Sequence, residues 1–325
     1  MLKNRLLFAF GFLNLPGKKK VSEYKLVQMK FSIVFASFLL ANLIGIQEIT
    51  AQSDFELMEA EIINIQKDIV AKLTGKTPIK GKKNISSRFT PGERRLTADY
   101  ITDLIKGLDI KPQKQSYDVQ DNRGSTFSGT NIYAEIPATT DSDEYVILCT
   151  HYDSSENSPG AVHNATGVAL TYFVGKQLLS LNYRTKNVML VFFDQQEASM
   201  MGNRMFVDKL QKENYRVHSM HRTDYIGWDN DEDRAIEIFS SSLGLESKYR
   251  IESFVPLFKR NVSSPESAVF SSFKFDNITV TAELKNGDNS PFIHQKGDEY
   301  NTVNFKYLAS TTEIVFRVLQ SLLEE

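Results

Sequence analysis

The sequence has only one cysteine, Cys149, among its 325 residues. A single cysteine cannot form an intrachain disulfide, so core packing and not a covalent cross-link must stabilise the fold. Cys149 lies within the apolar segment EYVILCT, where a buried thiol behaves as a small hydrophobic side chain. A catalytic nucleophile is the alternative, but we expect an ordinary core residue.

The sequence also lacks a strong excess of charge of one sign: 38 basic and 40 acidic residues give a formal charge of −2. Without the seven basic and two acidic residues of positions 1–51, 31 basic and 38 acidic residues remain, with a formal charge of −7. An acidic chain without a basic stripe argues against nucleic-acid binding, so we expect no nucleic-acid partner. Repeats and low-complexity segments are absent too, and 41% hydrophobic residues suit a globular protein with a substantial core.

Long hydrophobic runs are rare as well, and the one near the N-terminus extends from Phe31 to Ile46. This run is shorter than the about 20 residues that a membrane-spanning helix needs. It follows a lysine and precedes the small residue Ala51, which is typical of a secretory signal peptide. We therefore predict a signal peptide at residues 29–51, an exported protein (periplasmic or secreted), and no stable membrane span after cleavage. A transmembrane anchor is the alternative.

Residues 1–28 are an unusual prelude to a signal peptide. We predict that translation starts at Met29 and that residues 1–28 are a mis-assigned N-terminal extension. A long basic region before the apolar run is the alternative.

The rest of the chain alternates between two periodicities. Residues 52–85 hold a predicted helix (54–73) and a basic loop (74–84), and residues 86–325 read as a single α/β domain. Strands that are apolar on both faces and alternate with helices predict a three-layer α/β/α fold with a central, mainly parallel mixed sheet. The predicted helices are 90–108, 167–181, 199–211 and 303–323, and the predicted strands are 125–138, 144–150, 187–194, 219–226, 235–241 and 278–284.

Metal-binding residue types follow the ends of several predicted strands, which is the edge where such sheets bind ligands. His151 and Asp153 follow the run VILCT, and residues two apart in a strand point to the same side. A carboxylate that accepts one imidazole N–H leaves the other ring nitrogen free for a metal. Further candidates at successive element ends are His163, Glu197, Asp224 and His294.

Each of these residues alone has a structural explanation, as a surface residue or as a cap. The set is harder to dismiss, because the chain has only five histidines and three of them fall at these ends. We expect the other two, His218 and His221, to be surface or strand residues without a metal.

Five short segments carry a resemblance to a known family: THYDS, GAVHNATG, FDQQEASMMGN, DYIG and HQKGDE. In order and spacing they resemble metallopeptidase family 28, whose members include zinc aminopeptidases and glutaminyl cyclases. The similarity runs from about Ser86 to the C-terminus. It implies a zinc-exopeptidase-like fold, bound zinc, and a peptide or peptide-like small substrate.

The resemblance also implies a role for each matching residue. His151 and Asp224 would bind one zinc ion, and Glu197 and His294 would bind a second. Position 163 would bridge the two ions, Asp153 would orient His151, and position 196 would be the general base that takes a proton from the metal-bound water.

Two residues depart from the family pattern at the most demanding positions. The bridging aspartate is replaced by His163, which we expect to offer one neutral nitrogen to one metal at a time. We therefore predict one zinc ion in preference to two, held by His163, Glu197 and His294, since two histidines and a glutamate with an open water position form a known catalytic set.

The general base is replaced by Gln196, and an amide cannot accept a proton from water at neutral pH. General-base catalysis contributes on the order of 10²–10⁴-fold, so we expect impaired or altered catalysis. Asp194 lies two residues earlier and is not expected to substitute. The sequence thus predicts an exported aminopeptidase-like protein, and the alternatives are a non-catalytic pseudopeptidase that binds peptide or metal and a single-zinc cyclotransferase-like enzyme.

Overall fold

The computed structural model describes residues 58–325 except 121–123, 241, 261–274 and 286. The expected signal peptide and the extension before it lie outside the described residues. Residues Glu59–Glu325 form one compact unit. A search of the described helices finds none that combines the length and apolarity of a membrane span.

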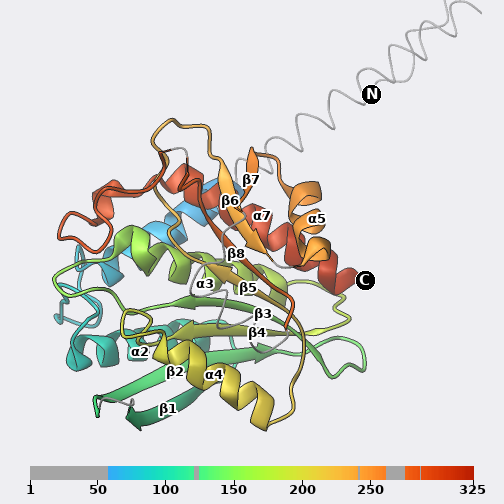
Figure 1. Ribbon diagram of the computed structural model, residues 1–325, viewed down its shortest axis with the longest axis horizontal. Coiled ribbons are helices and arrows are strands. Elements are labelled where there is room, and N and C mark those ends of the chain that lie inside the picture. Colours follow the sequence, from blue (N-terminus) through green and yellow to red (C-terminus); the bar gives the residue numbers. More distant parts are fainter. Residues whose placement is uncertain (1–57, 121–123, 241, 261–274, 286) are drawn as a thin grey trace, which may run out of the picture. The chain divides into compact units, whose positions relative to one another are not determined.

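An eight-stranded sheet runs through the described chain in the order β1-β2-β4-β3-β5-β8-β6-β7 (Figure 1). The neighbours β4, β3, β5 and β8 are parallel, and the pairs β1–β2, β2–β4 and β6–β8 are antiparallel. The strands are β1 (Pro112–Gln120), β2 (Thr126–Ile136), β3 (Glu144–His151), β4 (Asn187–Phe193), β5 (Arg216–Thr223), β6 (Ile236–Ser240), β7 (Leu257–Lys259) and β8 (Asn277–Ala282).

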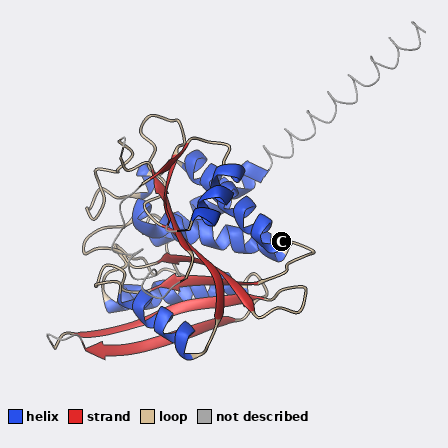
Figure 2. Ribbon diagram, turned by 45° about the vertical axis from the view of Figure 1, so that its right-hand side comes forward, coloured by secondary structure: helices blue, strands red, loops and turns tan. Residues whose placement is uncertain are grey.

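Helices cover both faces of this sheet (Figure 2). Val146 and Leu148 of β3 face the larger core, whereas Ile147 and Cys149 face the smaller one, because successive strand residues point to opposite sides. The larger core includes buried residues of α2, α3, α5, α7 and the helix over 58–73, and the smaller core is closed by α4. The bounds are α2 (Pro91–Lys106), α3 (Thr166–Leu179), α4 (Met201–Lys212), α5 (Leu243–Glu252) and α7 (Phe305–Glu324).

The predicted α/β/α fold with a mixed sheet is therefore confirmed. The start of α2 follows the sequence signal closely, because Thr90 caps the helix and Glu93 completes a capping box. Among the described strands and α-helices, β1, α5 and β7 were not predicted from the sequence. β1 lies at the sheet edge, and most of its side chains are polar and at least part-exposed, so it lacks the apolar run that marks the inner strands.

The residues set aside as structural have structural surroundings. Cys149 is fully buried, and burial raises the pKa of its thiol to about 12, as fits a core residue and not a nucleophile. His221 is a buried strand residue whose Nδ1 lies 3.1 Å from the Tyr249 hydroxyl. His218 is half-buried on the same strand.

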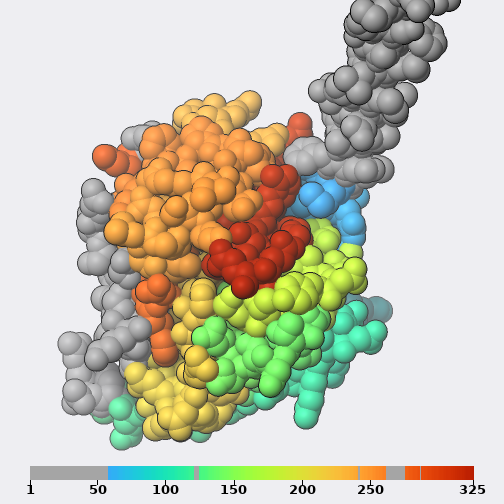
Figure 3. Space-filling view, turned by 90° about the vertical axis from the view of Figure 1, so that its right-hand side faces the viewer, coloured from blue at the N-terminus to red at the C-terminus, as the bar shows by residue number. Residues whose placement is uncertain are grey.

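The C-terminal end of α7 packs at the edge of the sheet where the parallel strands begin. Figure 3 shows it in red beside the orange segment that contains α5 and the yellow-green segment that follows α3. The carbonyl oxygens of Leu322 and Leu323 accept hydrogen bonds from Lys186 and Thr185, just before β4. The candidate functional residues lie at the opposite edge of the sheet, where β3, β4 and β5 end.

Candidate metal site

The structure brings all five predicted ligand residues together at the edge where the parallel strands end. His151 is the last residue of β3, and Asp224 directly follows β5. Glu197 follows β4, and His163 lies on the short turn η1 (Ala161–Ala165) before α3. His294 comes from the loop before η2 (Tyr300–Thr302). The side chains form two ligand groups that share His163.

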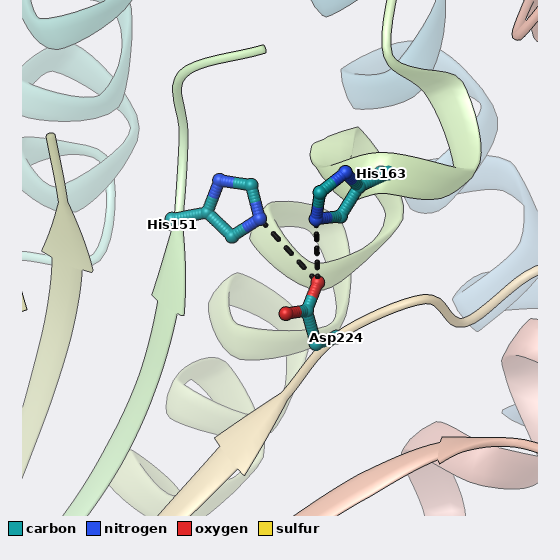
Figure 4. Close-up of side chains that lie close together, drawn as sticks. All are labelled: His151, His163 and Asp224. Carbon is teal, nitrogen blue, oxygen red and sulfur yellow. Dashed lines mark ion pairs between the residues drawn. The ribbon is translucent and has the colours of Figure 1, made fainter. Parts of the chain in front are cut away.

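The first group, His151, His163 and Asp224, is buried. Both imidazole rings point toward one oxygen of Asp224 (Figure 4). Asp224 Oδ1 lies 3.4 Å from His151 Nε2 and 3.2 Å from His163 Nε2. None of the three residues is more than 3% exposed, so solvent has little access to this group.

The second group, His163, Glu197 and His294, opens toward solvent. Glu197 Oε1 lies 3.3 Å from His163 Nδ1, and Glu197 Oε2 lies 3.4 Å from His294 Nε2. The side chain of His294 is 49% exposed and that of Glu197 is 15% exposed. His163 therefore presents one ring nitrogen to each group, whereas the sequence alone had suggested only that it serves one metal.

The geometry of both groups fits a divalent cation. His151 Nε2 and both ring nitrogens of His163 are buried and make no hydrogen bond with any described residue, although carboxylate oxygens lie within 3.4 Å. The ligand nitrogens and oxygens therefore lie close together, while these buried nitrogens make no hydrogen bond of their own within the described chain. Ligand atoms of a tetrahedral zinc site, with bonds of about 2.1 Å, lie roughly 3.4 Å apart, which matches these separations.

Asp153 connects the two groups. Its Oδ1 lies 3.2 Å from His151 Nδ1 and accepts a hydrogen bond of 3.0 Å from the Gln196 backbone N–H. Its Oδ2 accepts another, also 3.0 Å, from the Glu197 backbone N–H. One carboxylate thus fixes the ring of His151 and the chain direction at the end of β4.

The turn that carries His163 is held by residues far along the chain. The carboxylate of Asp298 accepts hydrogen bonds from the backbone N–H groups of Val162 (2.8 Å) and His163 (3.1 Å). Gly160 enters the turn at φ +63°, a left-handed conformation that favours glycine. The ring of Tyr225 stacks on His163 with centroids 4.2 Å apart. His163 therefore sits in a defined orientation between the two groups.

Gln196 and Asp194 lie beside the ligand groups, and both side chains are largely buried. Gln196 is 7% exposed, and no described residue hydrogen-bonds to its Oε1. Asp194 instead pairs with Arg94 Nε at 2.9 Å and accepts the Thr130 N–H at 3.0 Å, and it lines a cavity of about 400 Å³ beside α2. Burial raises the pKa of Asp194 to about 6, but its carboxylate is committed to these partners.

The histidines and carboxylates shift one another's ionisation. Burial alone would raise the pKa of Glu197, but His294 and His163 outweigh it and lower that pKa to about 2. Burial would lower the pKa of His151, yet Asp224 and Asp153 raise it to about 9. The pKa of His294 is raised by its contact with Glu197. Both carboxylates of the ligand set are therefore ionised near neutral pH, since the pKa of Asp224 also lies well below its usual value.

Two buried arginines at the site were not singled out from the sequence. The buried Arg88 binds the backbone carbonyls of Tyr152 and Gly160 and so fixes the loop between His151 and His163. The buried Arg222 donates a hydrogen bond to Asp224 Oδ2. Only its place two residues before Asp224 on a strand, which puts both side chains on one face, could have indicated this contact.

A comparison with models of protein families matches residues 131–319, more than half of the chain, to peptidase family M28. The chain belongs to this family. Membership fits a hydrolase of the metallopeptidase class, with zinc as the metal and peptides as the class of substrate. No curated protein sequence matches the chain.

Solved structures show the same fold at low sequence identity. A zinc aminopeptidase from Bacillus subtilis aligns with a TM-score of 0.70 and 12% identity, over 80% of this chain and 95% of that one. The Legionella pneumophila aminopeptidase LapA gives 0.66 and 16%, over 83% and 75%. A glutaminyl cyclase from Porphyromonas gingivalis gives 0.63 and 13%, over 80% and 98%.

Proposed function

We propose that this M28-family protein is exported and holds one zinc ion at His163 Nδ1, Glu197 and His294. We propose further that it binds the N-terminal part of peptides there and hydrolyses them slowly, as an aminopeptidase with impaired catalysis. The observation that carries the proposal is the second ligand group, which combines two histidines and a glutamate with access from solvent. Catalytic zinc sites keep such an open position, whereas structural zinc sites are closed.

Zinc bound in this group would polarise a peptide carbonyl and lower the pKa of its water. The chain's own residues then divide the remaining work. Asp153 holds the Gln196–Glu197 corner through two backbone hydrogen bonds, and so positions Glu197. Gln196 can hydrogen-bond to water but cannot take its proton, which is why we expect slow turnover.

The variant Gln196→Glu tests this proposal. We expect hydrolysis of aminoacyl p-nitroanilides to rise on the order of 10²-fold or more over the wild type, because a general base is worth on the order of 10²–10⁴-fold. Zinc content, measured by elemental analysis after dialysis against a weak chelator, should stay at one ion per chain. Gln195→Glu is a matched control, because Gln195 is an equally buried amide one residue away, and its rate should not rise.

Two outcomes would contradict the proposal. A wild-type protein that retains no zinc would favour a non-catalytic pseudopeptidase. A Gln196→Glu variant that folds, holds zinc and is no faster would show that the base is not the missing element.

The similarity in fold to a glutaminyl cyclase justifies adding a peptide with N-terminal glutamine to the assay. Ammonia release from that peptide by the wild type would favour cyclotransfer.

Export is the second part of the proposal, and it rests on the apolar run from Phe31 and the small residue Ala51. We expect expression in a bacterial host with an intact secretion system to give a protein that begins near residue 52 outside the cytoplasm. Intact-mass measurement on the fractionated protein tests this. An uncleaved protein in the membrane fraction would indicate an anchor instead.

A further inference from the structure

Arg222 places a fixed positive charge beside the first ligand group. It lies on β5, two residues before Asp224, and is 2% exposed. Its Nη2 donates to Asp224 Oδ2, while Asp224 Oδ1 faces His151 and His163. One oxygen of the shared carboxylate is thus committed to a guanidinium, and the other faces the two rings.

The charge of Arg222 bears on whether the first group can hold a cation. Its guanidinium already lies against the Asp224 carboxylate, and both side chains are 2% exposed. A zinc ion in this group would add two positive charges beside that buried guanidinium. Uncompensated charge in a buried site is costly, so the contact disfavours a zinc ion there.

Two further carboxylates of the described chain that lie near the groups have partners of their own. Asp194, which also lies close to Asp153, is paired with Arg94. Asp298 binds the backbone of the His163 turn and is partly offset by the buried Arg88. Each of these carboxylates has its own cationic neighbour.

Access also distinguishes the two groups. The first group is nearly sealed, with no member more than 3% exposed, whereas His294 opens the second group to solvent. A metal needs an entry path, and a catalytic metal needs an open position. If His163 Nδ1 binds a metal in the second group, its other ring nitrogen, Nε2, faces the Asp224 carboxylate. Metal-bound imidazoles favour a carboxylate beside the ring nitrogen that does not bind the metal.

We propose, as an inference that rests on the proposed zinc site, that Arg222 takes the place of a metal ion in the first group. The guanidinium neutralises Asp224, and so the protein binds a single zinc ion in the second group. Arg222 is a positioning residue in this arrangement, because it acts through Asp224 and contacts neither zinc nor substrate.

Zinc stoichiometry in the full-length chain tests this inference. We expect one tightly bound zinc ion per wild-type chain by elemental analysis after dialysis against a weak chelator. Arg222→Met removes the charge at similar length and should raise the content to two, whereas Arg222→Lys should leave it at one. Arg94→Met is the matched control, because Arg94 pairs with Asp194 outside both groups, and it should leave the content at one.

His294→Ala provides a second test that does not depend on how the Arg222 variants fold, because His294 is half-exposed. It should lose the zinc ion of the wild type. Two zinc ions in the wild type, one in a folded Arg222→Met variant, or one retained in His294→Ala would each overturn the role of Arg222 while leaving a zinc protein. No zinc in the wild type would instead overturn the proposed function and this inference with it.

Discussion

The conservative variant Asp298→Asn should weaken zinc binding without touching any ligand. Asp298 is fully buried, and each of its carboxylate oxygens accepts one backbone N–H, from Val162 at 2.8 Å and from His163 at 3.1 Å. Asparagine keeps the shape but offers only one oxygen. One of the two N–H groups then meets an NH₂ group and loses its acceptor.

The magnitude follows from these two contacts. Leaving one buried N–H unsatisfied costs about 1–3 kcal/mol, and we expect the free energy of unfolding of the zinc-free protein to fall by that amount. The turn that orients His163 loosens at the same time. Loss of an outer-shell support costs roughly 10–100-fold in metal affinity, so we expect a decrease in zinc affinity of that size.

Urea unfolding of the zinc-free protein and competition with a chromogenic chelator measure the two effects separately. Glu93→Gln is the control, because Glu93 also accepts backbone N–H groups, from Ser86 and Ser87, but at the start of α2. It should reduce stability and leave zinc affinity unchanged. If Asp298→Asn lost stability but bound zinc as tightly as the wild type, Asp298 would not position His163.

Three further predictions concern stability. Thr90→Ala removes the cap of α2 and should cost about 1 kcal/mol in urea unfolding without changing zinc affinity. Gly160→Ala forces a side chain into a left-handed conformation within 2.7 Å of the His163 carbonyl oxygen, so both stability and zinc affinity should fall; an unchanged unfolding midpoint would contradict this. In the zinc-free protein, the combined contribution of Glu197 and His151 to stability should be largest between about pH 4.5 and 6.5. This contribution should fall toward pH 2, because Glu197 has a pKa of about 2, lowered from 4.5, and contributes only while ionised. It should also fall toward pH 9, because His151 has a pKa of about 9, raised from 6.5, and contributes only while protonated. His151→Asn should flatten the alkaline arm of the curve of urea midpoint against pH.

Local patterns were enough to predict most of the inner elements. The runs EYVILCT and NVMLVFFD are apolar on both faces because β3 and β4 are covered by helices on both sides, and they appear at the predicted places. The edge strand β1 was missed because Tyr117 is its one buried residue and all the others are part-exposed or exposed. The more deeply a strand is buried, the more clearly its apolar sequence predicts it.

The sequence by itself determined the fold class and the five residues that gather at one edge, because parallel strands end together and each strand end is marked by its own side chain. It also determined the lack of a carboxylate at position 196. Only the tertiary structure decided that the two nitrogens of His163 face different ligand groups and that Asp194 turns away to Arg94. It likewise decided that Arg222 occupies one oxygen of Asp224 and that Asp298 holds the His163 turn from 135 residues along the chain. These contacts depend on side-chain direction and on packing between distant segments, which local periodicity does not specify.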